Sequence, residues 1–191
     1  MNDIASNPSS TWLRNYYLTR AAVSLLWIVL ALSVGKASPA TGGILLIAYP
    51  AWDALANYID GGKSGGLGRN RTQRLNFVLS LFVALVIGLT LAFDTSFSIL
   101  VFGFWAIAAG LLQLITAVKR WKVLGGQWAM ILSGAQSALA GGFFVKKAID
   151  GTQLDASVVA PYAAFGAFYF LVSAVWLAVK NWRNKGLTSS T

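Results

Sequence analysis

The stretch FGFWAIAAGLLQLITAVKRW, residues 102–121, decides the fold class of this chain. It carries no charge before Lys119, and only Gln113 and Thr116 interrupt its otherwise apolar or small side chains. An α-helix rises ~1.5 Å per residue, so ~20 residues of this kind cross the ~30 Å hydrocarbon core of a bilayer. The closing Lys-Arg-Trp suits the boundary with the lipid headgroups. The stretch therefore predicts a membrane-spanning helix that ends at a membrane surface.

The remainder of the chain follows the same pattern. Of its 191 residues, 57% are hydrophobic and only 11% are charged, whereas an ordinary soluble domain has about 25% charged residues. Long apolar runs alternate with short charged segments. We therefore expect an all-α polytopic membrane protein in which residues 1–191 form a single transmembrane domain. Its six spans are predicted near residues 16–34, 42–60, 75–93, 96–118, 127–145 and 158–179.

The distribution of Lys and Arg predicts how these spans are oriented. With the N-terminus inside, twelve of the 15 basic residues fall on the cytoplasmic side and three on the outer side. Such a positive-inside bias places both termini in the cytoplasm. The cytoplasmic residues are Arg14, Arg20, Lys63, Arg69, Arg71, Arg74, Lys119, Arg120, Lys122, Lys180, Arg183 and Lys185, and the outer ones are Lys36, Lys146 and Lys147.

The residue types that the chain lacks exclude several kinds of chemistry. It has no Cys, no His and no Glu. Disulfides, thiolate or imidazole metal sites and histidine-based acid–base catalysis are therefore excluded, and we expect no metal ion, no cofactor and no enzymatic activity. The net charge of +9 suits orientation in a membrane and contact with anionic lipid headgroups. No basic and aromatic cluster in a soluble segment points to nucleic-acid binding.

Two of the predicted spans end alike, which indicates an internal repeat. The stretches 102–121 and FGAFYFLVSAVWLAVKNW (165–182) share an FG start and a VK-x-W end. Each closes an out-and-back hairpin, so we interpret the chain as three parallel hairpin repeats about an axis along the membrane normal. The fourth and fifth spans also line up small residues at three- and four-residue spacing, which allows helix backbones to approach closely.

Six spans built from repeated hairpins, with the glycine-bearing stretches 102–121 and ILSGAQSALAGGFF (131–144), resemble the acid-resistance membrane protein family (HdeD-like). The resemblance covers residues 75–180 best. The polar stretch 48–76 departs from the short hairpin repeat of the family. It implies a multi-pass protein of the bacterial inner membrane with a loose association with acid or envelope stress. It supplies no catalytic residues, and it implies action through helix packing with a second copy or with another membrane protein.

The stretch AYPAWDALANYIDGGKSGG, residues 48–66, makes the second span the most polar of the six. Asp53, Asn57 and Asp60 recur there at helical spacing, so they share one face of the helix. A charged side chain at the middle of a bilayer is costly. This face is therefore expected to point into the protein and away from lipid.

Depth in the membrane suggests a partner for Asp53. Counted from the cytoplasmic boundary at ~1.5 Å per residue, Asp53 lies about 10 Å deep and Arg20 about 9 Å deep. We predict that these two residues form an ion pair, with Gln113 and either Ser133 or Ser173 completing its hydrogen bonds. The predicted intramembrane polar layer consists of Arg20, Asp53, Asn57, Gln113, Ser133 and Ser173.

Asp60 lies nearer the cytoplasmic surface, where we predict a pair with Arg71 or Arg74. The polar layer leaves two roles open. It is either a buried pair that sets the register between the first two spans, or the inward-facing vestibule of a small channel or carrier. The residues expected to meet anionic headgroups on the cytoplasmic side are Lys63, Arg69, Lys119, Arg120 and Lys122.

Overall fold

The computed structural model describes residues 9–90, 95–123, 127–151 and 155–188, and the chain is almost entirely helical within these ranges, without a strand. The predicted all-α class is thus confirmed. A π-helical turn, η1, extends the first long helix, and a short 3-10 helix, η2, precedes the last one. The elements are α1 (Ser10–Leu30), η1 (Ala31–Gly35), α2 (Pro39–Lys63), α3 (Arg71–Thr90), α4 (Thr95–Arg120), α5 (Gln127–Ile149), η2 (Ala156–Val159) and α6 (Ala160–Thr188).

Each predicted span corresponds to one long helix, and most helices extend a few residues beyond the predicted bounds. The residues 91–93 at the predicted end of the third span, and the short link at Asp94, lie outside the described residues. Hydroxyl side chains mark two of the helix starts. Ser9 Oγ accepts from the Trp12 amide at 3.2 Å, and Ser38 Oγ accepts from the Thr41 amide at 3.4 Å. Such caps satisfy amides that have no partner within the helix.

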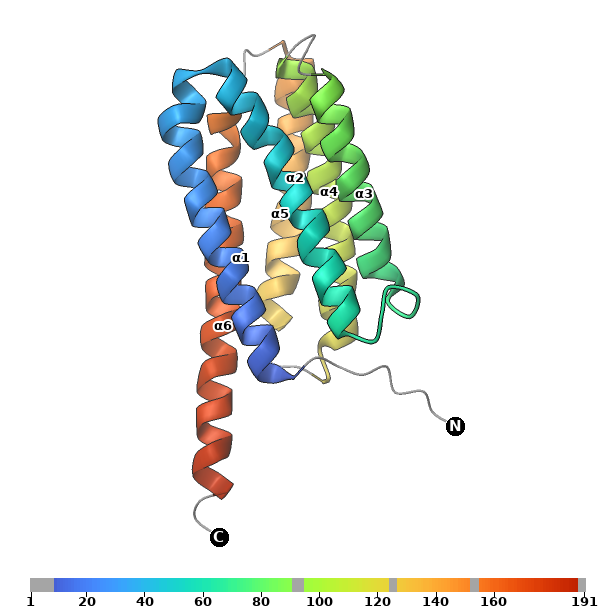
Figure 1. Cartoon of the computed structure of the whole chain (residues 1–191), viewed down its shortest axis with the longest axis vertical. Coiled ribbons are helices and arrows are strands. Elements are labelled where there is room, and N and C mark those ends of the chain that lie inside the picture. The colour runs from blue at the N-terminus through green and yellow to red at the C-terminus, as the bar shows by residue number, and fades with distance from the viewer. Residues whose placement is uncertain (1–8, 91–94, 124–126, 152–154, 189–191) are drawn as a thin grey trace.

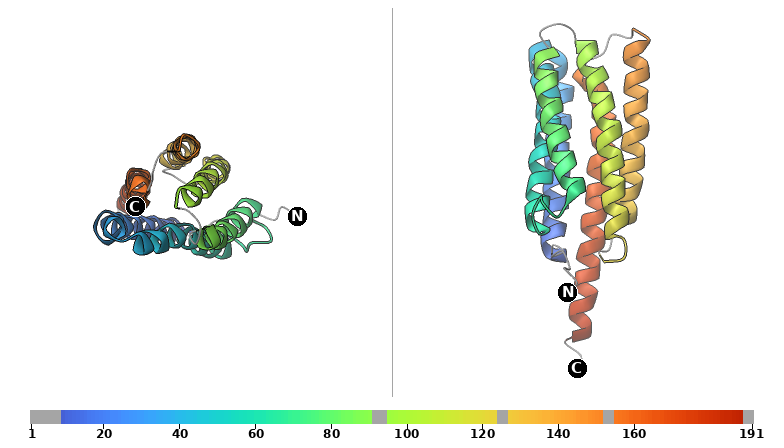
Figure 2. Two further views of the ribbon diagram at one scale, coloured as in Figure 1. Left: turned by 90° about the horizontal axis from the view of Figure 1, so that it is seen from above. Right: turned by 90° about the vertical axis from the view of Figure 1, so that its right-hand side faces the viewer.

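The six long helices stand side by side and follow one another in chain order around the bundle (Figures 1 and 2). α6 packs along α1 and closes the ring, and α4 packs along α5 more extensively than any other pair in the described part of the chain. α2 packs mainly against α3 and touches α1 much less. The largest contacts therefore join neighbours across the boundaries of the three predicted hairpins, and the internal repeat stays a prediction.

Glycines bring α4 and α5 into backbone contact. A Cβ atom added at Gly110 would lie 2.6 Å from the carbonyl oxygen of Gly134, and one added at Gly134 would lie 2.6 Å from that of Gly110. Gly103 and Gly141 face each other in the same way, at 2.9 and 2.5 Å. No side chain fits at such distances, so the predicted close approach through small residues is confirmed for this pair of helices.

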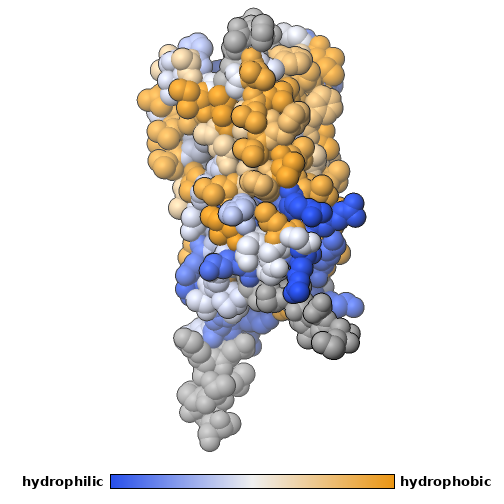
Figure 3. All heavy atoms as spheres, turned by 45° about the vertical axis from the view of Figure 1, so that its right-hand side comes forward, coloured by the Kyte–Doolittle hydropathy of each residue, from blue (hydrophilic) through white to orange (hydrophobic). Residues whose placement is uncertain are grey.

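The surface of the bundle is that of a multi-pass membrane protein. Five helical segments of the described chain are long and apolar enough to cross a membrane, and α2 is not among them. On the face drawn in Figure 3, hydrophobic side chains cover the upper part and hydrophilic ones gather below. The five segments are Ser10–Gly35, Arg71–Thr90, Phe97–Arg120, Gln127–Ile149 and Ala156–Arg183.

The two ends of the bundle differ in charge. α1 begins, and α2, α4 and α6 end, at the lower end in Figure 1, which we call the basic end because it carries Lys63, Arg69, Lys119 and Lys122. The opposite end is called the far end. α1 begins and α6 finishes at the basic end, as an even number of long helices of alternating direction requires (Figure 1). Which membrane face the basic end occupies stays a prediction.

The buried core divides along the same axis. In the far half it is built from apolar and aromatic side chains, among them Trp27, Ile87 and Phe102. A smaller apolar cluster that includes Leu13 and Leu177 lies in the basic half. Buried polar and charged side chains lie between and beside these clusters. This polar part of the core holds the candidate site.

Candidate functional site

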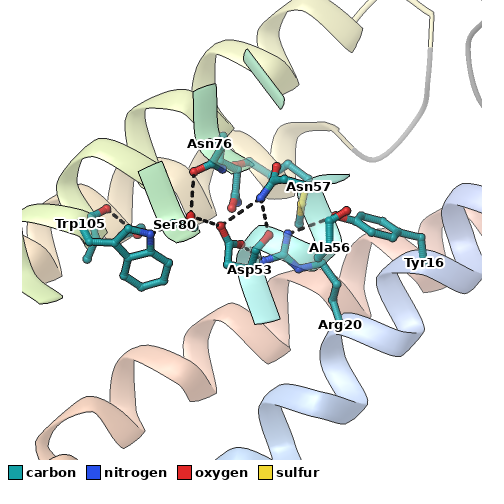
Figure 4. A network of polar contacts seen from close by, with 12 residues as sticks. Tyr16, Arg20, Asp53, Ala56, Asn57, Asn76, Ser80 and Trp105 are labelled. Atoms are coloured by element: carbon teal, nitrogen blue, oxygen red, sulfur yellow. Dashed lines mark hydrogen bonds and ion pairs between the residues drawn. The ribbon is translucent and has the colours of Figure 1, made fainter. Parts of the chain in front are cut away.

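An ion pair between α1 and α2 lies at the centre of the bundle. Arg20 Nη2 donates to Asp53 Oδ1, and Arg20 Nη1 donates to the Tyr16 hydroxyl at 3.2 Å (Figure 4). The two charged side chains are only 13% and 9% exposed. The guanidinium also lies 4.4 Å from the ring centroid of Phe170 on α6, which favours a cation. The pairing predicted from depth alone is confirmed.

The second oxygen of Asp53 ties α2 to α3 and α4. Asp53 Oδ2 accepts from Asn57 Nδ2 and from Ser80 Oγ, both at 3.0 Å. Ser80 Oγ in turn accepts from Trp105 Nε1 at 2.9 Å (Figure 4). Both carboxylate oxygens therefore have donors, and the network joins four helices. A buried carboxylate needs such partners, because an unpaired charge in a low-dielectric core is strongly unfavourable.

Ser80 and Trp105 belong to this network and were missed from the sequence. Ser80 lies four residues after Asn76, so the two polar residues share one face of α3, and this spacing was the available signal. The hydroxyl oxygen of Ser80 also lies 3.5 Å from Asn76 Oδ1, but its single proton is used in the shorter bond to Asp53. Trp105 carries no comparable signal, because an indole in an apolar helix is most simply interpreted as core packing.

The remaining predicted layer residues are placed differently. Gln113 Nε2 donates to the backbone oxygen of Met130 on α5 at 3.3 Å, so the prediction that it completes the Arg20–Asp53 pair is wrong. Gln113 and Ser133 nevertheless line the same cavity as Arg20. Ser173 is fully buried within α6. A role for Ser133 or Ser173 in the layer stays a prediction.

A second buried pair joins α2 to α4. Arg120 Nη2 lies 3.0 Å from each oxygen of Asp60, and it also donates to Ser64 Oγ at 3.0 Å. Gln73 Nε2 donates to Asp60 Oδ2 at 3.4 Å. Arg120 is only 8% exposed and is paired with Asp60, so it is a core residue, and its predicted role in binding lipid headgroups stays a prediction.

The predicted partners of Asp60 are also wrong. Arg71 and Arg74 lie on the exposed face of α3, whereas Thr72, Gln73 and Asn76 point into the bundle. Helix geometry explains the error, since Gln73 and Asn76 are three apart and share the inward face, which leaves Arg71 and Arg74 outside it. The other predicted headgroup residues are exposed at the basic end, namely Lys63, Arg69, Lys119 and Lys122.

Two small cavities lie on either side of Arg20, and Asp53 lines the first of them. The first, of about 40 Å³, is lined by side chains from all six long helices and reaches toward the far end at Tyr49 and Tyr162. The second, also of about 40 Å³, reaches toward the basic end at Asp60 and Arg120. At the ~10–15 Å³ that one water needs, each has room for roughly three waters. Both cavities are lined by Arg20, Asn76, Gln113 and Phe170.

Arg20 has one donor that the protein leaves unused. Its Nε is buried and has no hydrogen-bond partner within the described residues. A buried donor without a partner is unfavourable by about 1–3 kcal/mol or more. A water molecule in either cavity would satisfy it, because both are polar and large enough.

An aromatic cluster closes the path toward the far end. Tyr49, Phe102, Trp105 and Tyr162 pack with ring centroids 4.9–5.9 Å apart. Phe144 adds a further ring 6.0 Å from Phe102. Three of these residues, Tyr49, Trp105 and Tyr162, also form the wall of the first cavity. The polar lining therefore extends from the buried Asp60–Arg120 pair to the Arg20 layer and ends at these rings.

Comparison with known proteins adds no family to this description. The chain matches no protein-family model, and no curated protein or solved structure is significantly similar to it. Function must therefore be argued from the chain's own residues and their arrangement.

Proposed function

We propose that this chain is a non-enzymatic six-span membrane protein that carries protons or small ions through the cavities around Arg20 and Asp53. The observation that most supports this proposal is that two polar cavities share the buried Arg20, which is paired with Asp53, and that all six helices contribute to their lining. Ionisable groups inside a membrane bundle commonly mark ion or proton pathways. The residues assigned to the pathway are Arg20, Asp53, Asn57, Asn76 and Gln113.

In this proposal α2 is the sixth span, and both termini lie in the cytoplasm of a bacterial cell, with the bundle in the inner membrane. α2 is 25 residues long, enough for the hydrocarbon core at ~1.5 Å per residue. Its polar residues Asp53, Asn57 and Asp60 are buried against neighbouring helices, which explains how so polar a helix tolerates a membrane. The excess of Lys and Arg at the basic end supports the cytoplasmic assignment.

The cargo is limited by size. Cavities of about 40 Å³ accommodate water, a proton carried by water or a single small ion, and they are far below the ~300–1,000 Å³ of sites for larger ligands. Passage to the far side requires the rings of Tyr49, Phe102 and Tyr162 to separate. The arrangement thus corresponds to a state that is closed at the far end by these rings, with the buried Asp60–Arg120 pair between the second cavity and the basic end.

A second candidate function is architectural, in a protein of the HdeD-like type. Both oxygens of Asp53 have donors, so the pair also suits a role in holding α1, α2 and α3 in register. In this alternative the bundle associates with a second copy or with another membrane protein during acid or envelope stress. It needs no pathway through the aromatic cluster.

Flux measurements separate the two functions. The purified chain is reconstituted into liposomes that contain a pH-sensitive dye, and proton movement is recorded under an imposed pH gradient or membrane potential. We expect flux from the unaltered chain and at least a tenfold loss in Asp53→Asn, which removes the charge while the amide oxygen still accepts from Arg20.

The matched control is Asp150→Asn. Asp150 pairs with Lys146 on an exposed turn at the far end, at 2.5 Å with side chains 49% and 74% exposed, so the same substitution there should leave flux unchanged. Size-exclusion chromatography and circular dichroism verify that both variants are folded. Absence of proton flux and of K⁺ or Cl⁻ flux under every gradient would reject the carrier function and favour the architectural one.

A further inference from the structure

A third cavity lies at the basic end, outside the Arg20 layer. Its volume is about 180 Å³, and it is enclosed by the loop after α2, the start of α3 and the end of α4. Four cationic side chains line it, and no carboxylate does so in the described part of the chain. These four are Arg69, Arg71, Lys119 and Arg120.

Three of these four charges are not neutralised by the protein. Arg120 is already paired with Asp60, whereas Arg69, Arg71 and Lys119 form no ion pair within the described residues. Like charges gathered around one cavity repel each other, and the repulsion is relieved when an anion enters between them. The electrostatics of this cavity therefore favour a ligand with negative charge.

The loop that carries two of these cations is held in a defined shape. Asn70 Nδ2 donates to the backbone oxygens of Ser64 at 2.6 Å and Gly66 at 2.9 Å. Gly65 and Gly66 adopt φ values of 94° and 93°, which side-chain-bearing residues rarely adopt, so the chain can reverse between α2 and α3. Arg69 and Arg71 on either side of Asn70 are thereby fixed beside the end of α4.

Polar groups other than the cations complete the lining. Asn70 and Thr72 contribute amide and hydroxyl groups, and α3 begins at Arg71, so the positive end of its helix dipole adds to the field of the cations. Multiple donors around a concentrated negative charge are the usual means by which proteins bind phosphate. The volume is below that of sites for larger ligands, ~300–1,000 Å³, and suits a single phosphate group.

We propose that this cavity binds the phosphate group of an anionic ligand, held by Arg69, Arg71 and Lys119. Trp121, which directly follows Arg120, is 53% exposed, as expected where a helix leaves a membrane. A phosphate at this level comes either from a lipid headgroup or from inorganic phosphate in solution. The site does not depend on the proposed carrier function, because it lies outside the Arg20 cavities and is tested by binding instead of flux.

The test compares two double variants with equal loss of charge. Arg69→Gln/Arg71→Gln removes two cations from the cavity, and Lys63→Gln/Lys122→Gln removes two exposed cations of the basic end that do not line it. Calorimetry on the purified full chain in neutral detergent measures binding of inorganic phosphate. Binding of phosphatidylglycerol is measured against phosphatidylcholine in nanodiscs of defined composition.

We expect the cavity variant to bind its ligand at least tenfold more weakly and the control variant to stay within about twofold of the unaltered chain. Binding of phosphatidylglycerol alone assigns the site to a lipid headgroup, and binding of inorganic phosphate alone assigns it to a soluble anion. Equal losses in the two double variants would overturn the proposal, as would the absence of binding to both probes. Lys119→Gln provides the same comparison if the cavity variant does not fold.

Discussion

The far half and the basic half of this bundle use the same six helices but hold them together by different means. In the far half, aromatic rings interlock around Phe102 and the Gly103–Gly141 contact joins α4 to α5. The Gly110–Gly134 contact continues this backbone packing into the basic half. In the basic half, directed hydrogen bonds and two Arg–Asp pairs join the helices. Lipid is as apolar as a leucine side chain, so burial alone does not specify helix packing in a membrane. Close packing of rings dominates the far half, and two buried ion pairs with their hydrogen bonds distinguish the basic half.

The two halves of the core also differ in whether they can hold water. A core of interlocked rings excludes water, whereas a polar core with small cavities admits it. Arg20 Nε, a buried donor with no partner within the described residues, lies at the boundary between the two kinds of core. In the carrier proposal the basic half admits water and the far half excludes it, so substitutions in the two halves should have different consequences.

The largest effect is expected at the buried pair. Arg20→Met leaves the Asp53 carboxylate buried without its cation, which should lower the free energy of unfolding by about 3–5 kcal/mol. Replacing both partners in Arg20→Met/Asp53→Leu should restore most of this loss, because no unpaired charge remains. Thermal unfolding in detergent measures both changes. A double variant less stable than either single variant would show that the pair itself, and not charge balance, stabilises the basic half.

A somewhat smaller effect is expected where shape specifies the packing. Gly141→Leu places side-chain atoms where a Cβ already lies 2.5 Å from the oxygen of Gly103, so we expect destabilisation of about 3 kcal/mol. Gly142→Leu is the matched control, since a Cβ there meets nothing within 4 Å. Thermal unfolding of the two variants should differ clearly. Equal stability would mean that α4 and α5 do not approach as closely as described.

The smallest effect is expected at the second pair, nearer the basic end. Arg120→Gln leaves Asp60 with donors from Ser64 and Gln73 only, and we expect a loss of about 1–3 kcal/mol. Arg74→Gln removes the same charge from the exposed face of α3 and should change stability by less than about 0.5 kcal/mol. Chemical denaturation followed by circular dichroism compares the two. If Arg74→Gln lost more stability than Arg120→Gln, Arg74 would be the ion-pair partner of Asp60, as predicted from the sequence.

Much of the fold and of the Arg20–Asp53 pair could be predicted, because the position of a residue along a membrane-spanning helix determines its depth in the bilayer. The rise of ~1.5 Å per residue placed Arg20 and Asp53 at one level, and their opposite charges then indicated a pair. Glycine spacing likewise predicted close helix packing, which the contacts between α4 and α5 confirm. Apolar runs of suitable length gave the number of long helices.

The errors arise because the depth of a residue in the membrane does not define the helix toward which its side chain points. Gln113 lies at the predicted depth but points to α5, and Asp60 turns toward α4 instead of the nearby arginines of α3. Which helices are neighbours depends on the packing of the whole ring, and short-range spacing carries little of this information. Trp105 illustrates the limit, since only its position beside Ser80 distinguishes it from the other tryptophans.

In the carrier proposal the polar core is hydrated as far as the cavities beside Arg20, and the far half beyond the aromatic rings is dry. A high-resolution density map of the full chain in lipid nanodiscs tests it most directly. We expect ordered water in both small cavities, with one molecule accepting from Arg20 Nε, and none on the far side of the rings around Phe102. Empty cavities around a closed pair, or Arg20 and Asp53 separated and facing lipid, would contradict it.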